Sequence, residues 1–225
     1  MNNMQFTVYD ETVESQVKEI RKLVRLSMDG SVSESMASLG YKLNWGVSIP
    51  RIKELAARFG KDARLAMRLW NIGHRETMII ATLLMPENGC PESVAQAWAE
   101  DINNSELAEQ CCRNLFVRLP YADKLAELCY NKPDSPHTKE VAYRLASKFI
   151  MKGSSCGNDF SESLINNVKT DVQNKKLSDP IAQYLKQYAK HISKADAEKA
   201  LESLQDVNPW VFEEVSTFIN YSCCH

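Results

Sequence analysis

Hydrophobic residues recur along this chain every three or four positions, the spacing that places side chains on one face of an α-helix. Between residues 11 and 28 this face is formed by Val13, Val17, Ile20 and Val24. Asp29-Gly30 then ends the segment, because glycine is favoured just after a helix. The pattern therefore predicts a helix over 11–28, a shorter one over 33–39 and an irregular stretch over 41–47.

Capping residues and glycines divide the rest of the chain into short helical segments. Ser48 and Pro50 begin a predicted helix that Gly60 ends, and the segment 75–85 is apolar nearly all round, as in a helix buried on most sides. Further helices are predicted to begin at Asp62, Pro91, Asn104 or Ser105, after Pro120, after the Pro133–Pro136 break, at Phe160, at Asp179-Pro180, at Ser193 and at Asn208-Pro209.

This pattern predicts about thirteen helices and no strand, with helix pairs recurring roughly every 35 to 45 residues, the range of HEAT-type repeats. We predict an all-α fold, a right-handed superhelical stack of antiparallel helix pairs (a HEAT-like or ARM-type α-solenoid). Residues 1–225 would form one repeat domain of about six helix pairs. An irregular helical bundle without a groove is the alternative.

Composition agrees with short loops and rules out some functions. Only 8 Gly and 8 Pro occur, too few for the tight turns of an all-β protein. The net charge of −2 gives no global attraction to a polyanion, so any phosphate-binding surface must be local. From 51 to 75 seven basic residues stand against two acidic ones, whereas 87–109 holds six acids and no Lys or Arg. Solvated helix faces would explain the same runs.

The seven cysteines give no disulfide or metal-site pattern. No signal peptide precedes them, and no apolar stretch approaches the ~20 residues of a membrane span, so we expect a cytoplasmic protein with reduced thiols and no membrane partner. Cys223-Cys224-His225 looks like a set of metal ligands but lacks a second cluster, so no metal site is expected. No P-loop, dinucleotide fingerprint or HExxH motif is present.

The segment 45–85 reads WGVSIPRIKELAARFGKDARLAMRLWNIGHRETMIIATLLM and resembles the DNA alkylation repair (AlkD-like) family of HEAT-like repeat proteins. The family's start motif is matched by residues 46–56, its Leu-Trp element by Leu69-Trp70, and its basic-Glu pair by Arg75-Glu76. A weaker match to a late helix of the family covers residues 181–190.

The resemblance implies a curved stack whose concave face is basic and holds double-stranded DNA. Active members are glycosylases that excise alkylated, positively charged purines without a metal or organic cofactor. In them a carboxylate near the sugar stabilises the cationic charge that develops as the bond breaks, with aromatic side chains beside the deoxyribose.

The family's catalytic motif is only partly present. Its central Trp-Asp-x-x-Asp corresponds to the stretch 105–109, where Ser105 replaces the aromatic residue and Glu109 replaces the key Asp. An Arg expected on the next repeat falls near Lys139-Glu140, with Glu140 in the best register. Glu109 is thus the candidate catalytic residue; a solvated residue beside its neighbouring acid, or another binding role, is the alternative.

Other positions are candidates for contacts with DNA. Those for phosphate contacts are Arg51, Arg58, Arg64, Arg68, Lys148, Lys186 and Lys190. Trp45 and Tyr184 are candidate ligand-facing aromatics, Tyr184 lying near the family's late-helix Trp position. The other tryptophans, Trp70, Trp98 and Trp210, are predicted to pack in the core.

Three functions remain open from the sequence. The first is an alkylpurine DNA glycosylase acting on alkylated DNA. The second is a non-catalytic HEAT-like module that binds structured, for example branched, DNA, since the family's Trp and Arg were not found. The third is a scaffold for a protein partner.

Overall fold

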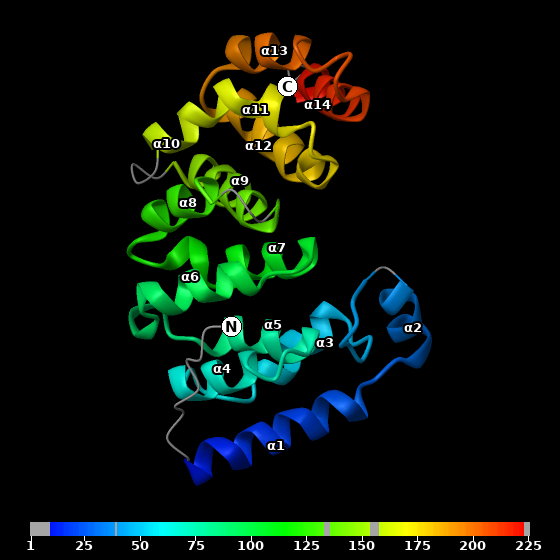
Figure 1. The fold of residues 1–225 in the computed structure, drawn as a ribbon, viewed down its shortest axis with the longest axis vertical. Helices are drawn as coiled ribbons and strands as arrows, with labels where there is room; N and C mark the ends of the chain where they lie inside the picture. The colour runs from blue at the N-terminus through cyan, green and yellow to red at the C-terminus, as the bar shows by residue number, and fades with distance from the viewer. Residues whose placement is uncertain (1–9, 39, 133–135, 154–157, 223–225) are drawn as a thin grey trace. The chain divides into compact units, whose positions relative to one another are not determined.

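The computed structural model describes residues 10–38, 40–132, 136–153 and 158–222, and it contains no strand within them (Figure 1). The prediction of an all-α chain is therefore confirmed. The chain divides into two compact units, with the boundary between Pro91 and Glu92. None of the helices in the described part of the chain is long and apolar enough to cross a membrane.

Unit 1 is built on α1 and three short helices whose buried faces meet. Its elements are α1 (Glu11–Leu26), α2 (Gly30–Ser38), α3 (Ile49–Ala56), α4 (Ala63–Trp70), α5 (Arg75–Leu84) and the 3-10 turn η1 (Glu87–Gly89). The predicted apolar face of α1 is buried against α3 and α4, and α5 is buried nearly all round, as its sequence predicted. Asp10 and Asp62 cap α1 and α4 by accepting backbone N–H bonds in the first turn.

The irregular stretch predicted over 41–47 is an ordered loop. The Asn44 amide donates to the Tyr41 carbonyl at 2.6 Å, and its oxygen accepts from the Gly46 N–H at 3.0 Å. Gly46 has φ of +69°, and a Cβ there would lie 2.4 Å from the Asp29 carbonyl oxygen. This position in the predicted family motif therefore requires glycine for both backbone conformation and space.

A buried ion pair fixes the end of this loop. Glu76 is 0% exposed, and its Oε1 accepts hydrogen bonds from the backbone N–H groups of Trp45 (3.1 Å) and Val47 (3.3 Å). The neighbouring Arg75 guanidinium donates to the same oxygen at 2.9 Å and to the Val47 carbonyl at 2.8 Å. The two charges thus hold the loop against α5.

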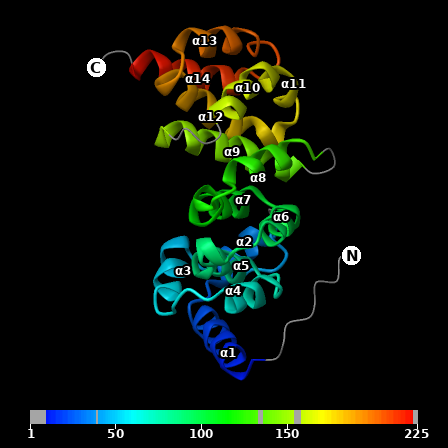
Figure 2. The ribbon, with the colours of Figure 1, turned by 90° about the vertical axis from the view of Figure 1, so that its left-hand side faces the viewer.

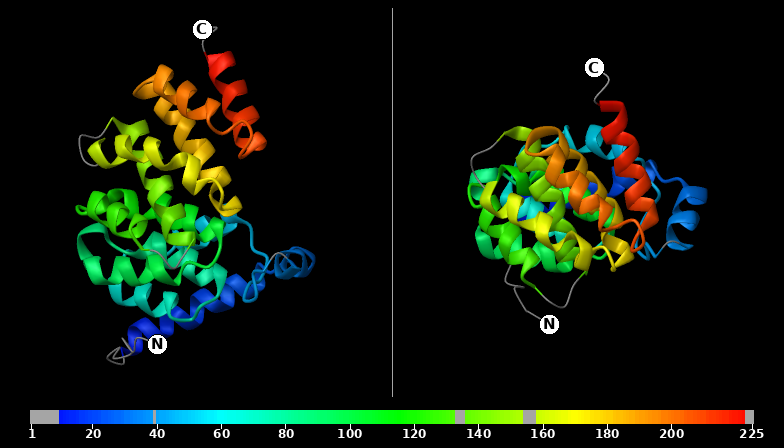
Figure 3. Two further views of the ribbon diagram at one scale, coloured as in Figure 1. Left: turned by 45° about the horizontal axis from the view of Figure 1, so that its top comes forward. Right: turned by 90° about the horizontal axis from the view of Figure 1, so that it is seen from above.

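Helix α2 differs from its neighbours because none of its residues is buried. It projects from the side of unit 1 (Figure 3). Exposed aliphatic side chains occur on and around it: Leu26, Met28, Val32 and Leu43.

Unit 2 is arranged around α9. Its elements are α6 (Glu92–Asp101), α7 (Ser105–Asn114), η2 (Phe116–Arg118), α8 (Ala122–Tyr130), α9 (Pro136–Lys152), α10 (Asn158–Ser163), η3 (Leu164–Asn167), α11 (Val168–Asp171), η4 (Lys175–Leu177), α12 (Ser178–His191), α13 (Lys194–Glu202) and α14 (Pro209–Ser222). Helix α9 packs against α6, α7, α8, α10 and α12, and it lies between α8 and α12 in Figure 1.

The helix predicted to begin at Phe160 is interrupted, which corrects the sequence interpretation. The segment forms α10, a 3-10 turn over Leu164–Asn167 and the short α11. Asn166 and Asn167 are poor helix formers, so the chain tightens there. The expected apolar side chains Leu164, Val168 and Val172 are nevertheless buried.

A buried carboxylate ties α11 to α8 and α9. Asp171 accepts hydrogen bonds from the hydroxyls of Tyr130 and Tyr143, both at 2.8 Å, and from the Lys139 ammonium at 2.7 Å. Burial, followed by the nearby Asp171, raises the pKa of Tyr143, so this hydroxyl stays a donor at every relevant pH. The carboxylate therefore has the partners that a buried charge needs.

Helices α12, α13 and α14 pack together at one end of unit 2 (Figure 2). Val211, Val215 and Ile219 of α14 are buried there. Trp210 lies off this stripe and is 50% exposed, so the prediction that it packs in the core is wrong. Trp70 and Trp98 are buried, as predicted.

The cysteines within the described residues are free thiols: Cys90, Cys111, Cys112 and Cys129. All four are buried. Burial raises the pKa of Cys129 to about 12 and that of Cys111 well above its usual value, which disfavours the reactive thiolate. Cys223-Cys224-His225 lies outside the described residues.

Replacing Glu76 by Gln should destabilise unit 1 strongly, because the buried Arg75 guanidinium loses the negative charge of its neighbour Glu76. We expect the free energy of unfolding to fall by about 3 kcal/mol in urea titrations followed by circular dichroism. The matched control is Glu54→Gln, which removes the exposed Arg51–Glu54 pair and should cost less than about 0.5 kcal/mol. Equal losses for both variants would contradict the role assigned to Glu76.

Candidate functional site

Ser105 and Glu109, which the family resemblance placed at a catalytic motif, belong to a dense set of charged and polar side chains in unit 2. We call it the polar cluster, and its members are Ser105, Glu109, His137, Glu140, Arg144, Lys148 and Asp179. Helix α7 supplies the first two and α12 the last. The other four recur every three or four residues along α9, which places them on one face of that helix.

Local capping positions the contribution of α7. The Asn104 side chain accepts the Leu107 N–H at 2.8 Å, which starts the helix at Ser105. Ser105 and Glu109 are therefore four residues apart on one helical face. The buried Leu107, Ala108 and Cys111 hold the opposite side of α7 in the core.

Glu140 is the buried centre of the polar cluster. Its Oε2 accepts from the Ser105 hydroxyl at 3.0 Å and faces the His137 Nδ1 at 3.1 Å. Its Oε1 accepts from the Arg144 Nε at 2.9 Å and from a terminal nitrogen of the same side chain at 2.8 Å. Burial alone would raise the pKa of Glu140, but the bonds from His137, Arg144 and Ser105 outweigh it and lower the pKa. Glu140 is therefore ionised at neutral pH.

Arg144 links all three helices. Besides Glu140, its guanidinium contacts the Glu109 carboxylate at 3.0 Å and the Asp179 carboxylate at 3.0 Å. The side chain is only 10% exposed. Burial lowers its pKa, but Glu140 and Glu109 more than offset this and raise the pKa, so the charge is permanent. A planar guanidinium suits such an arrangement because it presents several donors in fixed directions.

Glu109, the candidate catalytic residue, lies between two cations. Its Oε2 accepts from Arg144 at 3.0 Å and its Oε1 accepts from the Lys148 ammonium at 2.9 Å. The carboxylate is 29% exposed, so solvent and ligands can still reach it. Both oxygens are nevertheless engaged by positive groups, which offset the negative charge.

An Arg side chain does contact Glu109, one helical turn beyond the position considered from the sequence. The sequence interpretation placed the expected Arg at Glu140, which implied that an Arg had been lost. Arg144, one helical turn later on the same face of α9, contacts Glu109 instead. Glu109 and Arg144 thus form an acid–Arg pair between α7 and α9, and the Ser105 hydroxyl bonds to Glu140 beside it.

Most of the predicted phosphate-binding residues are already paired. Arg64 contacts Asp10 at 2.7 Å and Arg68 contacts Glu14 at 2.5 Å, so both face α1. Arg51 donates to the Ser27 hydroxyl and to Glu54.

In unit 2, Lys148 pairs with Glu109 at 2.9 Å and Lys186 with Glu214 at 2.5 Å. Arg58 in unit 1 and Lys190 in unit 2 are exposed, and neither forms an ion pair with a described residue.

A second set of cations was missed from the sequence. Exposed basic residues recur along α1 and form no ion pair with any described residue: Lys18, Arg21, Lys22 and Arg25. We call them the α1 basic stripe. Their spacing places them along one side of the helix, and this spacing was the signal that could have identified them.

The two candidate aromatic residues have different surroundings. Trp45 is half-buried and stacks on the His74 ring, with centroids 4.0 Å apart and planes 14° from parallel. Burial lowers the pKa of His74, so this is a stack of neutral rings at pH 7.

Tyr184 is fully buried and donates its hydroxyl to the Ser161 carbonyl at 2.6 Å. It faces the core of unit 2, which corrects the prediction that it faces a ligand.

Comparison with known proteins agrees with this geometry. A family model described as DNA alkylation repair enzyme matches residues 33–209. Among solved structures, the chain is similar to one reported as "A new family of proteins related to the HEAT-like repeat DNA glycosylases with affinity for branched DNA structures". The two are 17% identical with a TM-score of 0.68, covering 84% of this chain and 82% of that one. A search of curated proteins gives no match.

The structural likeness confirms the HEAT-like, all-α fold class predicted from the helix pairs. The family model spans well over half of the sequence and includes the loop at Gly46, the buried Arg75-Glu76 pair and the polar cluster. The chain therefore belongs to the DNA alkylation repair enzyme family.

Proposed function

We propose that this protein binds structured DNA through the phosphate backbone and does not excise bases. The observation that carries the proposal is the state of Glu109, whose two carboxylate oxygens accept hydrogen bonds from Arg144 and Lys148. The position of the family's sugar-facing aromatic residue holds Ser105, which is bonded to Glu140.

This arrangement is poorly suited to breaking a glycosidic bond. The carboxylate must stabilise positive charge on the sugar as the bond breaks, and the stabilisation depends on the net field at that point. Two cations within hydrogen-bond distance of Glu109 oppose that field. Losing the aromatic residue also removes a stacking contact with the nucleotide of about 1–3 kcal/mol.

Binding to phosphates has a better basis in the α1 basic stripe. Its four exposed cations form no ion pair with the described residues. They can therefore contact DNA without breaking an ion pair within the protein. Lys and Arg on an exposed helix position DNA through its backbone without reading sequence. The overall charge of −2 requires such a local patch.

Branched DNA is the form of DNA that we infer for this binding. The similar solved structure belongs to proteins with affinity for branched DNA structures, and those proteins are described as related to the glycosylases rather than as glycosylases. A member that has lost the aromatic residue but kept the fold fits the same description. Contacts with phosphates alone do not depend on base sequence, so they suit a branched DNA in which several phosphate backbones lie close together.

Excision of alkylated purines is a second candidate, favoured by the partial exposure of the Glu109 carboxylate. An acid stands at the position that the family resemblance implied, and its carboxylate is 29% exposed. A cationic purine needs little help to leave. In this case DNA phosphates would have to draw Lys148 away from Glu109 before the carboxylate could act.

We expect the protein to bind a four-way DNA junction more tightly than a duplex of the same sequence, as measured by fluorescence anisotropy. Replacing Arg21, Lys22 and Arg25 together by Gln should weaken junction binding by about tenfold and reduce the slope of log K against log salt by about two to three. The matched control replaces three exposed lysines of unit 2, Lys169, Lys175 and Lys176, by Gln. An equal effect of both triple variants would show that only net charge matters and would contradict a site on α1.

Duplex DNA that contains 7-methylguanine should release no free base when incubated with excess protein, because Glu109 is offset by two cations. Base release would be measured by chromatography after single-turnover incubation. Release by the wild type that disappears in Glu109→Gln would refute the proposed lack of catalysis and establish the second candidate.

A further inference from the structure

The stack of Trp45 on His74 presents aromatic surface to solvent in unit 1. The two rings are nearly parallel, and both residues are partly exposed. Trp70 and Trp98, in contrast, are enclosed in the core. An aromatic ring that is left partly exposed can stack on a ligand.

Backbone hydrogen bonds hold this stack in place. The Trp45 N–H donates to the buried Glu76 carboxylate at 3.1 Å, and the Trp45 carbonyl accepts from the Asp29 N–H at 3.1 Å. The His74 carbonyl accepts from the Met78 N–H at 2.9 Å, where α5 begins. Aromatic side chains fixed in this way lose little conformational freedom when a ligand stacks on them, which favours binding.

A cation of the α1 basic stripe lies near the stack. Burial is the main cause of the lowered pKa of His74; the charge of Glu76 raises this pKa, and the charge of Arg21 lowers it further. Because the effect of a charge falls with distance, Arg21 lies near the His74 ring. Arg21 is exposed and forms no ion pair with a described residue. An aromatic surface and an exposed cation therefore occur close together.

This combination matches the two ends of a nucleotide. A base can stack on an aromatic ring whatever its sequence, because every base has a π face, and the adjoining phosphate can pair with a cation. Bases within a duplex are covered by their neighbours, whereas an unpaired base at a branch point is accessible. Arg21 would repel a positively charged alkylated base, so the surface suits an ordinary, neutral one.

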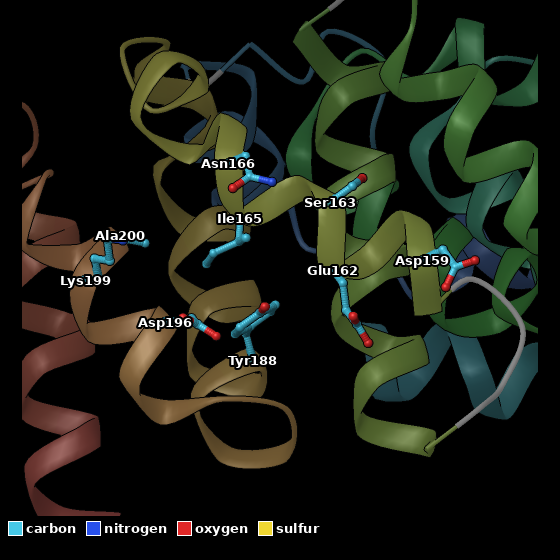
Figure 4. Close-up of a pocket in the computed structure, with 9 residues that line it drawn as sticks. All are labelled: Asp159, Glu162, Ser163, Ile165, Asn166, Tyr188, Asp196, Lys199 and Ala200. Atoms are coloured by element: carbon cyan, nitrogen blue, oxygen red, sulfur yellow. The ribbon is translucent and has the colours of Figure 1, made fainter.

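The pocket of unit 2 offers an aromatic ring with the opposite charge around it. Figure 4 shows this pocket between α10, η3, α12 and α13, with Tyr188 in its lining. Three carboxylates and one ammonium also line it: Asp159, Glu162, Asp196 and Lys199. This negative surrounding repels phosphates, so the pocket does not suit a nucleotide.

We propose that an unpaired base at the branch point of a DNA junction stacks on Trp45 while an adjoining phosphate contacts Arg21. The inference rests on the proposed function, because it names the part of branched DNA that unit 1 recognises in addition to phosphates. Stacking on Trp45 adds a preference for unpaired bases, whereas the α1 basic stripe attracts any DNA backbone.

Fluorescence anisotropy with two three-way DNA junctions tests this inference. The junctions have the same arms, and one carries two unpaired adenosines at its branch point. We expect the wild type to bind that junction at least about fivefold more tightly than the fully paired one, the gain from stacking one base. Trp45→Leu should lose this preference and still bind the fully paired junction within about twofold of the wild type, because the phosphate contacts remain. Trp45→Phe keeps an aromatic ring and should retain a preference of at least about twofold.

The matched control is Trp210→Leu, which removes a half-exposed tryptophan of α14 in unit 2 and should keep the preference of the wild type. No preference in the wild type, or a preference that persists in Trp45→Leu, would overturn the inference. The proposed function would survive that result if the triple Gln variant of α1 still weakened junction binding. Equal weakening of both junctions by Trp45→Leu and by Trp45→Phe would indicate a purely structural ring and would overturn the inference too. Failure of the wild type to bind either junction would overturn both proposals.

Discussion

A buried positive charge must be matched by negative partners, and this requirement at Arg144 organises the centre of unit 2. The guanidinium contacts carboxylates from α7, α9 and α12, and among the described residues the fully buried Glu140 bonds to Arg144, His137 and Ser105. Removing Arg144 would leave the buried Glu140 carboxylate without the guanidinium that bonds its Oε1, and removing Glu140 would take away the most buried of the three carboxylates around Arg144. The three helices are therefore held together by the same side chains that a catalytic site would need.

Because the same side chains hold the helices together, Glu109 is not left free of neighbouring cations. Glu109 is drawn toward Arg144 and Lys148, and Ser105, where the family resemblance implied an aromatic residue, bonds to Glu140. These contacts stabilise the polar cluster. In the proposed function they also offset the negative charge of Glu109 that would have to stabilise the cationic sugar. In the proposed function, contacts with DNA phosphates are made instead by the α1 basic stripe, whose cations form no ion pair with the described residues.

Features that depend on neighbouring residues could be predicted from the sequence. The caps at Asp62 and Ser193, the buried stripe of α1 and the apolar α5 all follow from local spacing and propensity. Pairings across the chain could not be predicted, because nothing local indicates that Arg64 meets Asp10 or that Arg144 rather than Glu140 meets Glu109. Likewise, periodicity alone does not indicate that Tyr184 bonds to the Ser161 carbonyl.

The most direct test is a double-mutant cycle on the free energy of unfolding, using Glu140→Gln, Arg144→Met and the double variant in urea titrations. If the pair holds α7, α9 and α12 together, each single variant should be strongly destabilised and the double variant much less than their sum. We expect a coupling energy of about 2 kcal/mol. Additivity of the two losses within about 0.5 kcal/mol would contradict the account, because Arg144 and Glu140 would then contribute to stability independently.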